Sequence, residues 1–315
     1  PEFMSGGIGA RSTRLGQPVE TAPSSETDDV FSVIRDYISL TKPRIISLLL
    51  LTTVATMFVA DPAGPPLSLI LWTMLGGYLA AGGAGAINHY IDRGRDAQMA
   101  RTDSRPLANG RIEPIHGLIF GIALGAIAFF QLWITVNLLS AGLAMLGLLG
   151  YVFLYTMWLK PITPQNIVIG GSAGAVPPLV GWAAASGSLT LEALWPFLII
   201  FFWTPPHFWA LSLMIKDDYE RTGVPMLPVV KGEAETRKQI LIYTLIMVAV
   251  TIGPFVTGLL GGLYLASAIG LGAVFIGMSV MLFRNPDTNI TLRLYLYSLA
   301  YLALLFVAMA IDAVS

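Results

Sequence analysis

The chain has 315 residues, of which 55% are hydrophobic and only 12% are charged, and its formal net charge is −1. Soluble domains carry about 25% charged residues, so this composition excludes an ordinary soluble protein and favours a membrane protein, and the near-zero charge gives no sign of a nucleic-acid partner. The absence of cysteine excludes disulfides, thiolate metal sites and a cysteine nucleophile.

The N-terminal residues are predicted to form a tail. Residues 1–3 (PEF) precede the first methionine and are typical of a vector-derived scar. The residues from 5 to about 30 are rich in Ser, Gly, Thr and Pro and lack the apolar core of a signal peptide. We therefore expect a disordered tail over residues 1–34 and a single domain over residues 35–315.

Nine apolar segments follow the tail, each close to the length of about 20 residues that spans a bilayer. Within lipid the backbone must satisfy its own hydrogen bonds, which favours helices. The sequence thus predicts an all-α polytopic membrane protein with nine transmembrane helices. Their approximate ranges are 38–60, 67–89, 117–137, 140–159, 166–186, 193–214, 240–260, 263–283 and 292–312.

The positive charges test this count of helices. Every Lys and Arg either precedes or begins the first predicted helix or lies after the second, fourth, sixth or eighth, and the opposite loops have none. The positive-inside rule then predicts a cytoplasmic N-terminus, two long cytoplasmic loops and a C-terminus outside the cell membrane.

Two features suggest a weak internal repeat of four helices, with the ninth helix left over. The loops at 91–110 and 215–232 both open with acids and then carry Arg-Thr, Pro and Gly, and the stretches YISLTKP (37–43) and YTMWLKP (155–161) share the spacing from Tyr to Lys-Pro. Transporters are often built from repeats as well, so this pattern does not choose between an enzyme and a transporter.

Three oxygen-bearing side chains lie on one helix face where the second apolar segment ends. In NHYIDRGRD, residues Asn88, Asp92 and Asp96 are spaced four apart, which places them in a row along the helix. Ionised Asp beside the hydrocarbon is costly and usually functional, and oxygen ligands without His or Cys suit Mg²⁺ bound together with substrate phosphates. The alternative is a solvated helix end with ordinary surface carboxylates.

A second acidic cluster, Asp217, Asp218 and Glu220, is predicted to lie on the same membrane face. Two acidic patches can hold two Mg²⁺ ions across one diphosphate. We therefore expect a metal–diphosphate site in which Asn88, Asp92, Asp96 and Asp218 are catalytic, and in which the metal ligands are Asn88, Asp92, Asp96, Asp217 and Asp218.

Basic residues near these acids are candidates for binding the phosphates. Arg101 and Arg105 are four residues apart and suit a bidentate grip on phosphate oxygens. Lys42, Arg44 and Lys216 lie at predicted helix mouths. The alternative is that these residues serve only as positive-inside charges.

A diphosphate site that opens into an apolar helix bundle favours a prenyl diphosphate substrate. Loss of the diphosphate would leave an allylic carbocation, which aromatic faces stabilise and which must be shielded from water. Pro205 and Pro206 are expected to break or kink their helix and to bring His207 towards an acceptor. Asn166 faces the cavity or only caps its helix, and His89 packs at the mouth or contacts the diphosphate.

The stretch NHYIDRGRDAQMARTDSRPL resembles the N-x3-D-x3-D signature of the UbiA-type intramembrane prenyltransferases. Four more stretches, TKPR (41–44), TPQNIVIGGSAGAVPPLVGW (163–182), WTPPHFWALSL (203–213) and DYERTGVPMLPVVKG (218–232), resemble the branch of this family that farnesylates haem. The resemblance implies a nine-helix bundle, Mg²⁺, and transfer of farnesyl from farnesyl diphosphate to the 2-vinyl group of haem B, with water supplying a hydroxyl group.

The same resemblance adds Tyr219, with Asn166 and His207, to the expected substrate contacts, and it suggests contact with haem A synthase or with terminal oxidase assembly. In one respect the chain departs from the wider family, because Thr222 follows Asp218 where a second Asp is common. The ligands of a second Mg²⁺ therefore stay open, with Asp217 and Glu220 as candidates. The alternative functions are prenylation of a quinone precursor or chlorophyllide, and cation or metabolite transport.

Overall fold

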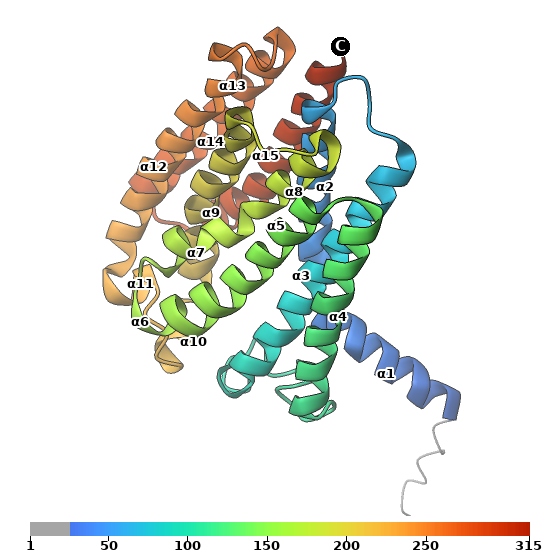
Figure 1. Ribbon diagram of the computed structural model, residues 1–315. Helices are drawn as coiled ribbons and strands as arrows, with labels where there is room; N and C mark the ends of the chain where they lie inside the picture. The colour runs from blue at the N-terminus through green and yellow to red at the C-terminus, as the bar shows by residue number, and fades with distance from the viewer. Residues whose placement is uncertain (1–25) are drawn as a thin grey trace, which may run out of the picture. The chain divides into compact units, whose positions relative to one another are not determined.

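The computed structural model describes residues 26–315, and every regular element within them is a helix (Figure 1). Residues 36–315 form one compact unit, and the residues before them belong to a separate unit. The first helix, α1 (Glu26–Leu40), includes residues 26–34 of the predicted tail, whose disorder stays a prediction. The rest of that tail, with the scar at 1–3, lies outside the described residues.

Nine helical segments in the described part of the chain are long and apolar enough to cross a membrane, which confirms the predicted all-α polytopic fold. Six are α2 (Pro43–Ala60), α3 (Leu67–Asp96), α4 (Pro114–Thr135), α14 (Gly262–Arg284), α15 (Thr288–Val314) and α9 (Leu194–Met214), the last preceded by a short turn, η2 (Leu191–Ala193). Three are composite: α5 (Leu138–Leu149) with η1 (Gly150–Leu159) and α6 (Lys160–Ile162), α7 (Asn166–Gly174) with α8 (Val176–Ser186), and α12 (Gly232–Thr251) with α13 (Gly253–Val256).

The chain breaks between α1 and α2, inside the first predicted span. Lys42 has φ 59°, and it is the one residue other than glycine with a positive φ in the described part of the chain. Pro43 begins α2 directly after it, and proline is well suited to a first helical position because it has no N–H to leave unpaired. The left-handed backbone costs free energy, and it places the Lys42 side chain at the junction of the two helices.

Close packing of α3 on α4 depends on small residues. A Cβ atom on Gly83 would lie 2.7 Å from the carbonyl oxygen of Gly121, and one on Gly76 would lie 2.3 Å from the Leu132 side chain. Backbones can approach this closely only where side chains are small. The glycine- and alanine-rich stretch of α3 therefore does serve helix packing on one of its faces.

The prediction at Pro205 and Pro206 is a break or a kink of the helix. The helix α9 runs without interruption through both prolines, so a break is wrong, and a kink stays a prediction. Both prolines are buried, and neighbouring helices in a membrane protein can hold such a helix together. One contact between α9 and its neighbour α15 is a hydrogen bond in which the Trp203 indole N–H donates to the carbonyl oxygen of Ser298 at 2.8 Å.

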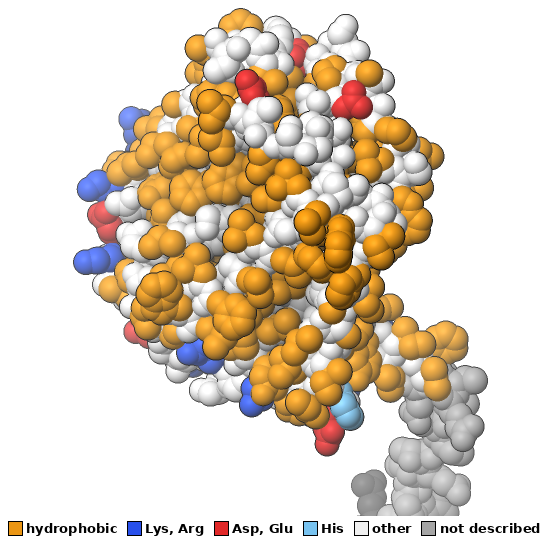
Figure 2. All heavy atoms as spheres, viewed as in Figure 1, with side chains coloured by type: hydrophobic (Ala, Val, Ile, Leu, Met, Phe, Trp, Pro, Cys, Tyr) orange, Lys and Arg blue, Asp and Glu red, His pale blue; other side chains and the backbone are white. Residues whose placement is uncertain are grey.

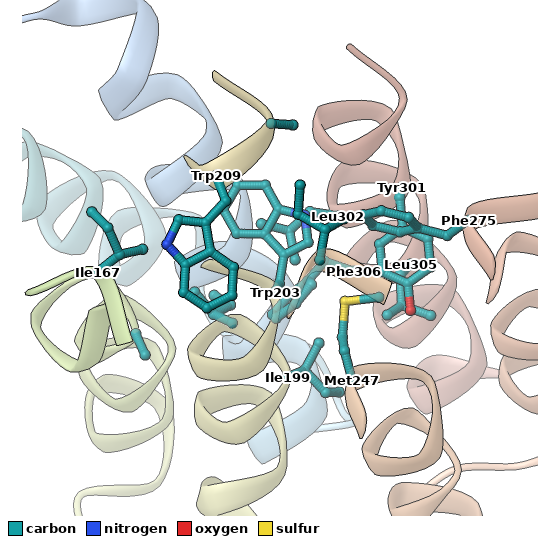
Figure 3. Packing of buried hydrophobic residues seen from close by; sticks show 14 of the residues in the cluster. Ile167, Ile199, Trp203, Trp209, Met247, Phe275, Tyr301, Leu302, Leu305 and Phe306 are labelled. Atoms are coloured by element: carbon teal, nitrogen blue, oxygen red, sulfur yellow. The ribbon is translucent and has the colours of Figure 1, made fainter. Parts of the chain in front are cut away.

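Bulky side chains form the main core between α9, α12, α14 and α15 (Figure 3). Trp209, Phe275, Tyr301 and Phe306 are each at most 1% exposed. Large apolar side chains also cover the outer surface: on the face in Figure 2 they dominate, and charged side chains are few and lie towards its margins. A surface of this kind is what a bundle in contact with lipid requires.

Within residues 36–315, the segments that connect the long helices fall into two groups, one at each end of the bundle. Figure 1 shows the α3–α4 loop, α6, α10 (Lys216–Arg221) and α11 (Leu227–Val230) at one end, while α13 and the C-terminus lie at the other. The former group contains the predicted acidic and basic clusters. The fold therefore brings the two long loops to the same end of the bundle, as the sequence predicts.

Candidate active site

The three residues of the acid ladder, defined as Asn88, Asp92 and Asp96, are buried in the last turns of α3. They are 4%, 2% and 5% exposed, so the alternative of a solvated helix end is wrong. The Asn88 amide donates to Asp92 Oδ2 at 2.8 Å and to Thr156 Oγ1 at 3.2 Å. The spacing of four residues thus produces a continuous polar row inside the bundle.

Cationic side chains from three parts of the chain converge on the ladder. Lys42 Nζ donates to Asn88 Oδ1 at 2.7 Å, Lys160 Nζ to Asp92 Oδ2 at 2.5 Å, and Arg105 Nη1 to Asp96 Oδ2 at 2.7 Å. Arg95 adds a longer contact to Asp92 at 3.5 Å. Buried carboxylates are tolerated when they are paired in this way, so each rung of the ladder has its own donor.

Lys160 was not among the residues singled out from the sequence. Its side chain is 14% exposed and forms the shortest ion pair of the ladder. The available signal was the repeat, because Lys160 occupies the same place in YTMWLKP that Lys42 occupies in YISLTKP. The structure shows what the shared spacing does: each Lys-Pro pair delivers one ammonium group to the same row of oxygen atoms.

The π-helix η1 precedes Lys160 and positions its neighbours. Within η1 the Thr156 hydroxyl donates to the carbonyl oxygen of Tyr151, five residues earlier, at 2.8 Å, and it also accepts from Asn88. Wide π-turns are rare in proteins and frequent at functional sites. The Tyr151 ring lies 5.8 Å from Lys42 Nζ, so η1 lines the ladder with both a hydroxyl and an aromatic face.

The second loop contributes Tyr219 to this region more clearly than it contributes acids. Tyr219 is 4% exposed. Burial raises the pKa of its phenol to about 12; nearby Arg101 and Arg105 act to lower it, and Asp92 and Asp218 to raise it. The Tyr219 hydroxyl is therefore influenced by the charges of the ladder, and its role as a substrate contact stays a prediction.

The predicted five-residue metal set is not assembled as one cluster. No group of three or more His, Cys, Asp or Glu side chains with metal-binding geometry occurs among the described residues. Asp217 is exposed, and Asp218 pairs with Arg221. The ladder by itself offers two carboxylates and an amide, which fits Mg²⁺ that completes its shell with waters and phosphate oxygens. A second metal on Asp217 and Asp218 stays a prediction.

The remaining predicted basic residues differ in their surroundings. Arg44 and Arg101 are exposed, and Lys216 pairs with Glu233 at 3.4 Å. At the ladder itself, desolvation and repulsion from Arg105 and Lys160 lower the pKa of Lys42 to about 7, against the attraction of Asp92 and Asp96. An added anion would favour the charged form of this lysine.

Asn166 and His89 are among the buried side chains whose polar atoms find no hydrogen-bond partner in the described part of the chain. Both amide atoms of Asn166, which is 0% exposed, and both ring nitrogens of His89, which is 3% exposed, are unpaired. Buried polar groups are normally paired. The interpretation of Asn166 as a helix cap is therefore not supported, and its predicted substrate contact stays a prediction.

An apolar cavity of about 240 Å³ begins beside the ladder. Lys42 and Tyr151 line it at that end, and its walls come from α2, α3, α5, α7 and α8. The wall formed by α3 consists of the small residues Gly77, Ala80, Ala81, Ala84 and Gly85. The small-residue stretch therefore packs against α4 on one face and leaves room on another.

His207 does not line this cavity, and its predicted contact with the acceptor stays a prediction. Its ring stacks between Trp203, at 4.3 Å between centroids, and Tyr295, at 4.9 Å. Its Nδ1 lies 2.6 Å from Ser298 Oγ, and Ser298 Oγ donates to the carbonyl oxygen of Tyr295. Because the Ser298 hydroxyl proton is used in that bond, His207 Nδ1 carries the proton and Nε2 keeps its lone pair.

Comparison with known proteins shows the family to which this chain belongs. The model of the UbiA prenyltransferase family matches residues 49–311. A protoheme IX farnesyltransferase of Roseiflexus sp. (strain RS-1) is 55% identical over 95% of this chain and 57% of its own length. One of Symbiobacterium thermophilum is 52% identical over 89% of this chain and 94% of its own. The chain spans about half the length of several of these relatives, among them those of Roseiflexus castenholzii (52%) and Chloroflexus aurantiacus (48%).

Solved structures share the fold at low identity. A digeranylgeranylglyceryl phosphate synthase aligns with a TM-score of 0.73 and 16% identity over 90% of this chain and 99% of that one. A UbiA homologue from Archaeoglobus fulgidus bound to DMAPP and Mg²⁺ aligns with a TM-score of 0.62 and 15% identity over 88% and 99%. These likenesses confirm the predicted UbiA-like bundle.

The ladder and its cations predict binding of pyrophosphate together with Mg²⁺. We expect this pair to raise the melting temperature of the detergent-solubilised protein, because a ligand at 100 times its Kd stabilises the folded state by about 2.7 kcal/mol. Lys160→Met should reduce the shift. Lys238→Met is the matched control, because Lys238 is exposed and pairs with Glu235, away from the ladder. An unchanged shift in Lys160→Met would remove Lys160 from the anion site.

Proposed function

Because the chain belongs to the UbiA prenyltransferase family, we propose that it transfers a farnesyl group from farnesyl diphosphate to the 2-vinyl group of haem B, releasing diphosphate and giving haem O. The observation that carries the proposal is the position of the paired acid ladder at the end of an apolar cavity, with Lys42 in contact with both. The identity of 52–55% to proteins named protoheme IX farnesyltransferase supports the choice of substrates.

The diphosphate group is proposed to bind at the ladder as its Mg²⁺ complex. Asn88, Asp92 and Asp96 would hold the metal, and Lys42, Lys160 and Arg105 would donate to phosphate oxygens. Mg²⁺ neutralises the charge that develops on the departing diphosphate. In the structure, each of these cationic side chains pairs with an oxygen atom of the ladder. When the Mg²⁺–diphosphate complex binds, Mg²⁺ would become the new partner of the ladder oxygens, and the diphosphate would become the new partner of the Lys and Arg side chains.

The prenyl tail is proposed to lie in the apolar cavity. Its lining is almost entirely hydrocarbon, which excludes water from the allylic cation formed as the C–O bond breaks. The Tyr151 ring lines the cavity near Lys42 and offers an aromatic face to that cation. The new C–C bond joins the first farnesyl carbon to the terminal vinyl carbon, and water adds to the resulting cation on the haem side chain and releases one proton to give the hydroxyl group.

Haem B is proposed to bind near the aromatic column of Trp203, His207 and Tyr295. A metal-binding His generally donates its second N–H to a fixed acceptor, and His207 Nδ1 has such an acceptor in Ser298. The Nε2 lone pair is then available as an axial ligand for the haem iron. Passage of the product to haem A synthase or to terminal oxidase assembly is proposed on the resemblance alone.

The orientation in the cell membrane is proposed from the charges. The ladder end of the bundle carries the Lys- and Arg-containing loops, and the loops at the other end have none. The positive-inside rule places the ladder and the diphosphate on the cytoplasmic side. Reporter fusions at Asn109 and Gly232 should read as cytoplasmic, and fusions at Pro62 and Ser188 as external. Reversal of any one of the four would refute this orientation.

Removal of the ladder carboxylates should abolish most of the transfer activity. Asp92→Ala and Asp96→Ala each remove a charge-stabilising interaction, and comparable losses in enzymes cost about 10²–10³ in rate. Haem O is measured by mass spectrometry after membranes are supplied with haem B, farnesyl diphosphate and Mg²⁺. Asp103→Ala serves as the control, because Asp103 is an exposed carboxylate in the adjacent loop. Full turnover by the Asp92→Ala, Asp96→Ala double variant at normal expression would disprove the metal–diphosphate site.

His207→Ala should weaken haem binding far more than farnesyl diphosphate binding, whereas Asp92→Ala should do the reverse. Titration of haem B followed through its Soret absorption gives the first affinity, and competition by farnesyl diphosphate gives the second. Ser298→Ala should change the Soret band of bound haem in the same direction as His207→Ala, because it removes the hydrogen-bond partner that holds the His207 ring. Its loss of affinity for haem B should be smaller. His116→Ala is the control, since His116 is 58% exposed. Unchanged haem binding in His207→Ala would make His207 a packing residue.

A further inference from the structure

The apolar cavity has a defined direction. From the ladder end it follows α2 through Lys42, Ile46, Leu49 and Thr53, while α3 lines it in the opposite chain direction from Gly85 to Gly77. At the helical rise of 1.5 Å per residue, the path along α2 is about 16 Å long. The cavity is therefore an elongated channel that begins at the proposed diphosphate site.

The far end of this channel is closed by tightly packed helices. Its last lining residues are Thr53 on α2, Gly77 on α3, Ala144 on α5 and Val180 on α8. The residues one turn farther along the same four helices are all 0% exposed, and they are Met57, Thr73, Ala141 and Ala183. The first layer is thus a floor, and the second layer leaves no open space behind it.

Gly77 keeps one side of this floor open. A Cβ atom at position 77 would lie 3.1 Å from Leu50 Cδ2, and Leu50 also lines the channel. A larger side chain at position 77 would therefore have to displace Leu50 or occupy the channel at this level. Val180 belongs to the same floor and to the packed cluster that contains Ala141 and Ala183.

We infer that Gly77 and Val180 set the length of the prenyl chain that the protein accepts, with a limit of three isoprene units. Three extended units measure roughly 14 Å and four roughly 19 Å, given carbon–carbon bonds of about 1.5 Å. The first length fits the channel and the second exceeds it. This inference rests on the proposed function, because it takes the channel to hold the tail of the donor.

The test measures donor binding without any acceptor. Geranyl, farnesyl and geranylgeranyl diphosphate, each with Mg²⁺, are compared by their Kd for the detergent-solubilised full chain. The wild-type protein should bind farnesyl diphosphate more tightly than geranyl diphosphate, because the third unit buries more apolar surface. It should bind geranylgeranyl diphosphate no more tightly than farnesyl diphosphate. Tighter binding of the longest donor would overturn the inference without any variant.

Two variants from different helices raise the floor. Gly77→Met and Val180→Phe should each change the ratio of the Kd for farnesyl diphosphate to the Kd for geranyl diphosphate by at least about tenfold in favour of geranyl diphosphate. The reason is that methylene groups displaced from an apolar pocket cost about that much in affinity. Gly142→Met is the control, since Gly142 has no atom within 4 Å of its Cβ position and does not line the channel. If folded Gly77→Met and Val180→Phe keep the wild-type ratio, the floor does not set the length.

Failure of this inference differs from failure of the proposed function. A wild-type protein that makes haem O, while its variants keep the original donor preference, retains the function and loses the length limit. A wild-type protein that shows the expected order of donor affinities but makes no haem O from haem B retains the length limit and loses the acceptor. Gly77→Ala, a smaller change with a smaller expected shift, replaces Gly77→Met if the latter does not fold.

Discussion

Two carboxylates buried at the end of a membrane helix must be compensated, and much of the surrounding structure serves that need. Asp92 and Asp96 are at most 5% exposed, and unpaired charges at such depth are very costly. The break at Lys42, the π-helix that precedes Lys160 and the loop that returns Arg105 to Asp96 each deliver one cation. The same pairs that stabilise the fold are the groups proposed to bind a metal–diphosphate complex, so the proposal makes stability and binding depend on one network.

The two halves of the bundle differ in how they use side-chain volume. In the N-terminal half, small residues on α3 allow close packing on α4 and leave an elongated apolar channel on another face. In the C-terminal half, Trp209, Phe275, Tyr301 and Phe306 fill the space between helices. The stacked ring of His207 belongs to this aromatic half. The proposed donor site and the proposed acceptor site therefore lie in regions of opposite packing character.

The repeated Tyr-to-Lys-Pro spacing gains a physical meaning in this arrangement. In both copies the Lys precedes Pro at the start of a new helical segment, although the first Lys has a left-handed backbone and the second a helical one. The two ammonium groups still reach adjacent rungs of one ladder. Equivalent sequence positions thus converge on a shared site from different helices, which is an economical way to surround a diphosphate with cations.

Local pattern alone was enough for the nine spans, the grouping of Lys and Arg in alternate loops and the row Asn88, Asp92 and Asp96, because hydropathy and helical period act between near neighbours in the chain. The pairing of Lys160 with Asp92, the isolation of His207 from the channel and the floor at Gly77 and Val180 were decided by tertiary packing. Each of these features depends on contacts between helices that are far apart in sequence. The uninterrupted course of α9 through Pro205 and Pro206 has the same cause, because the surrounding helices outweigh a local preference for a break.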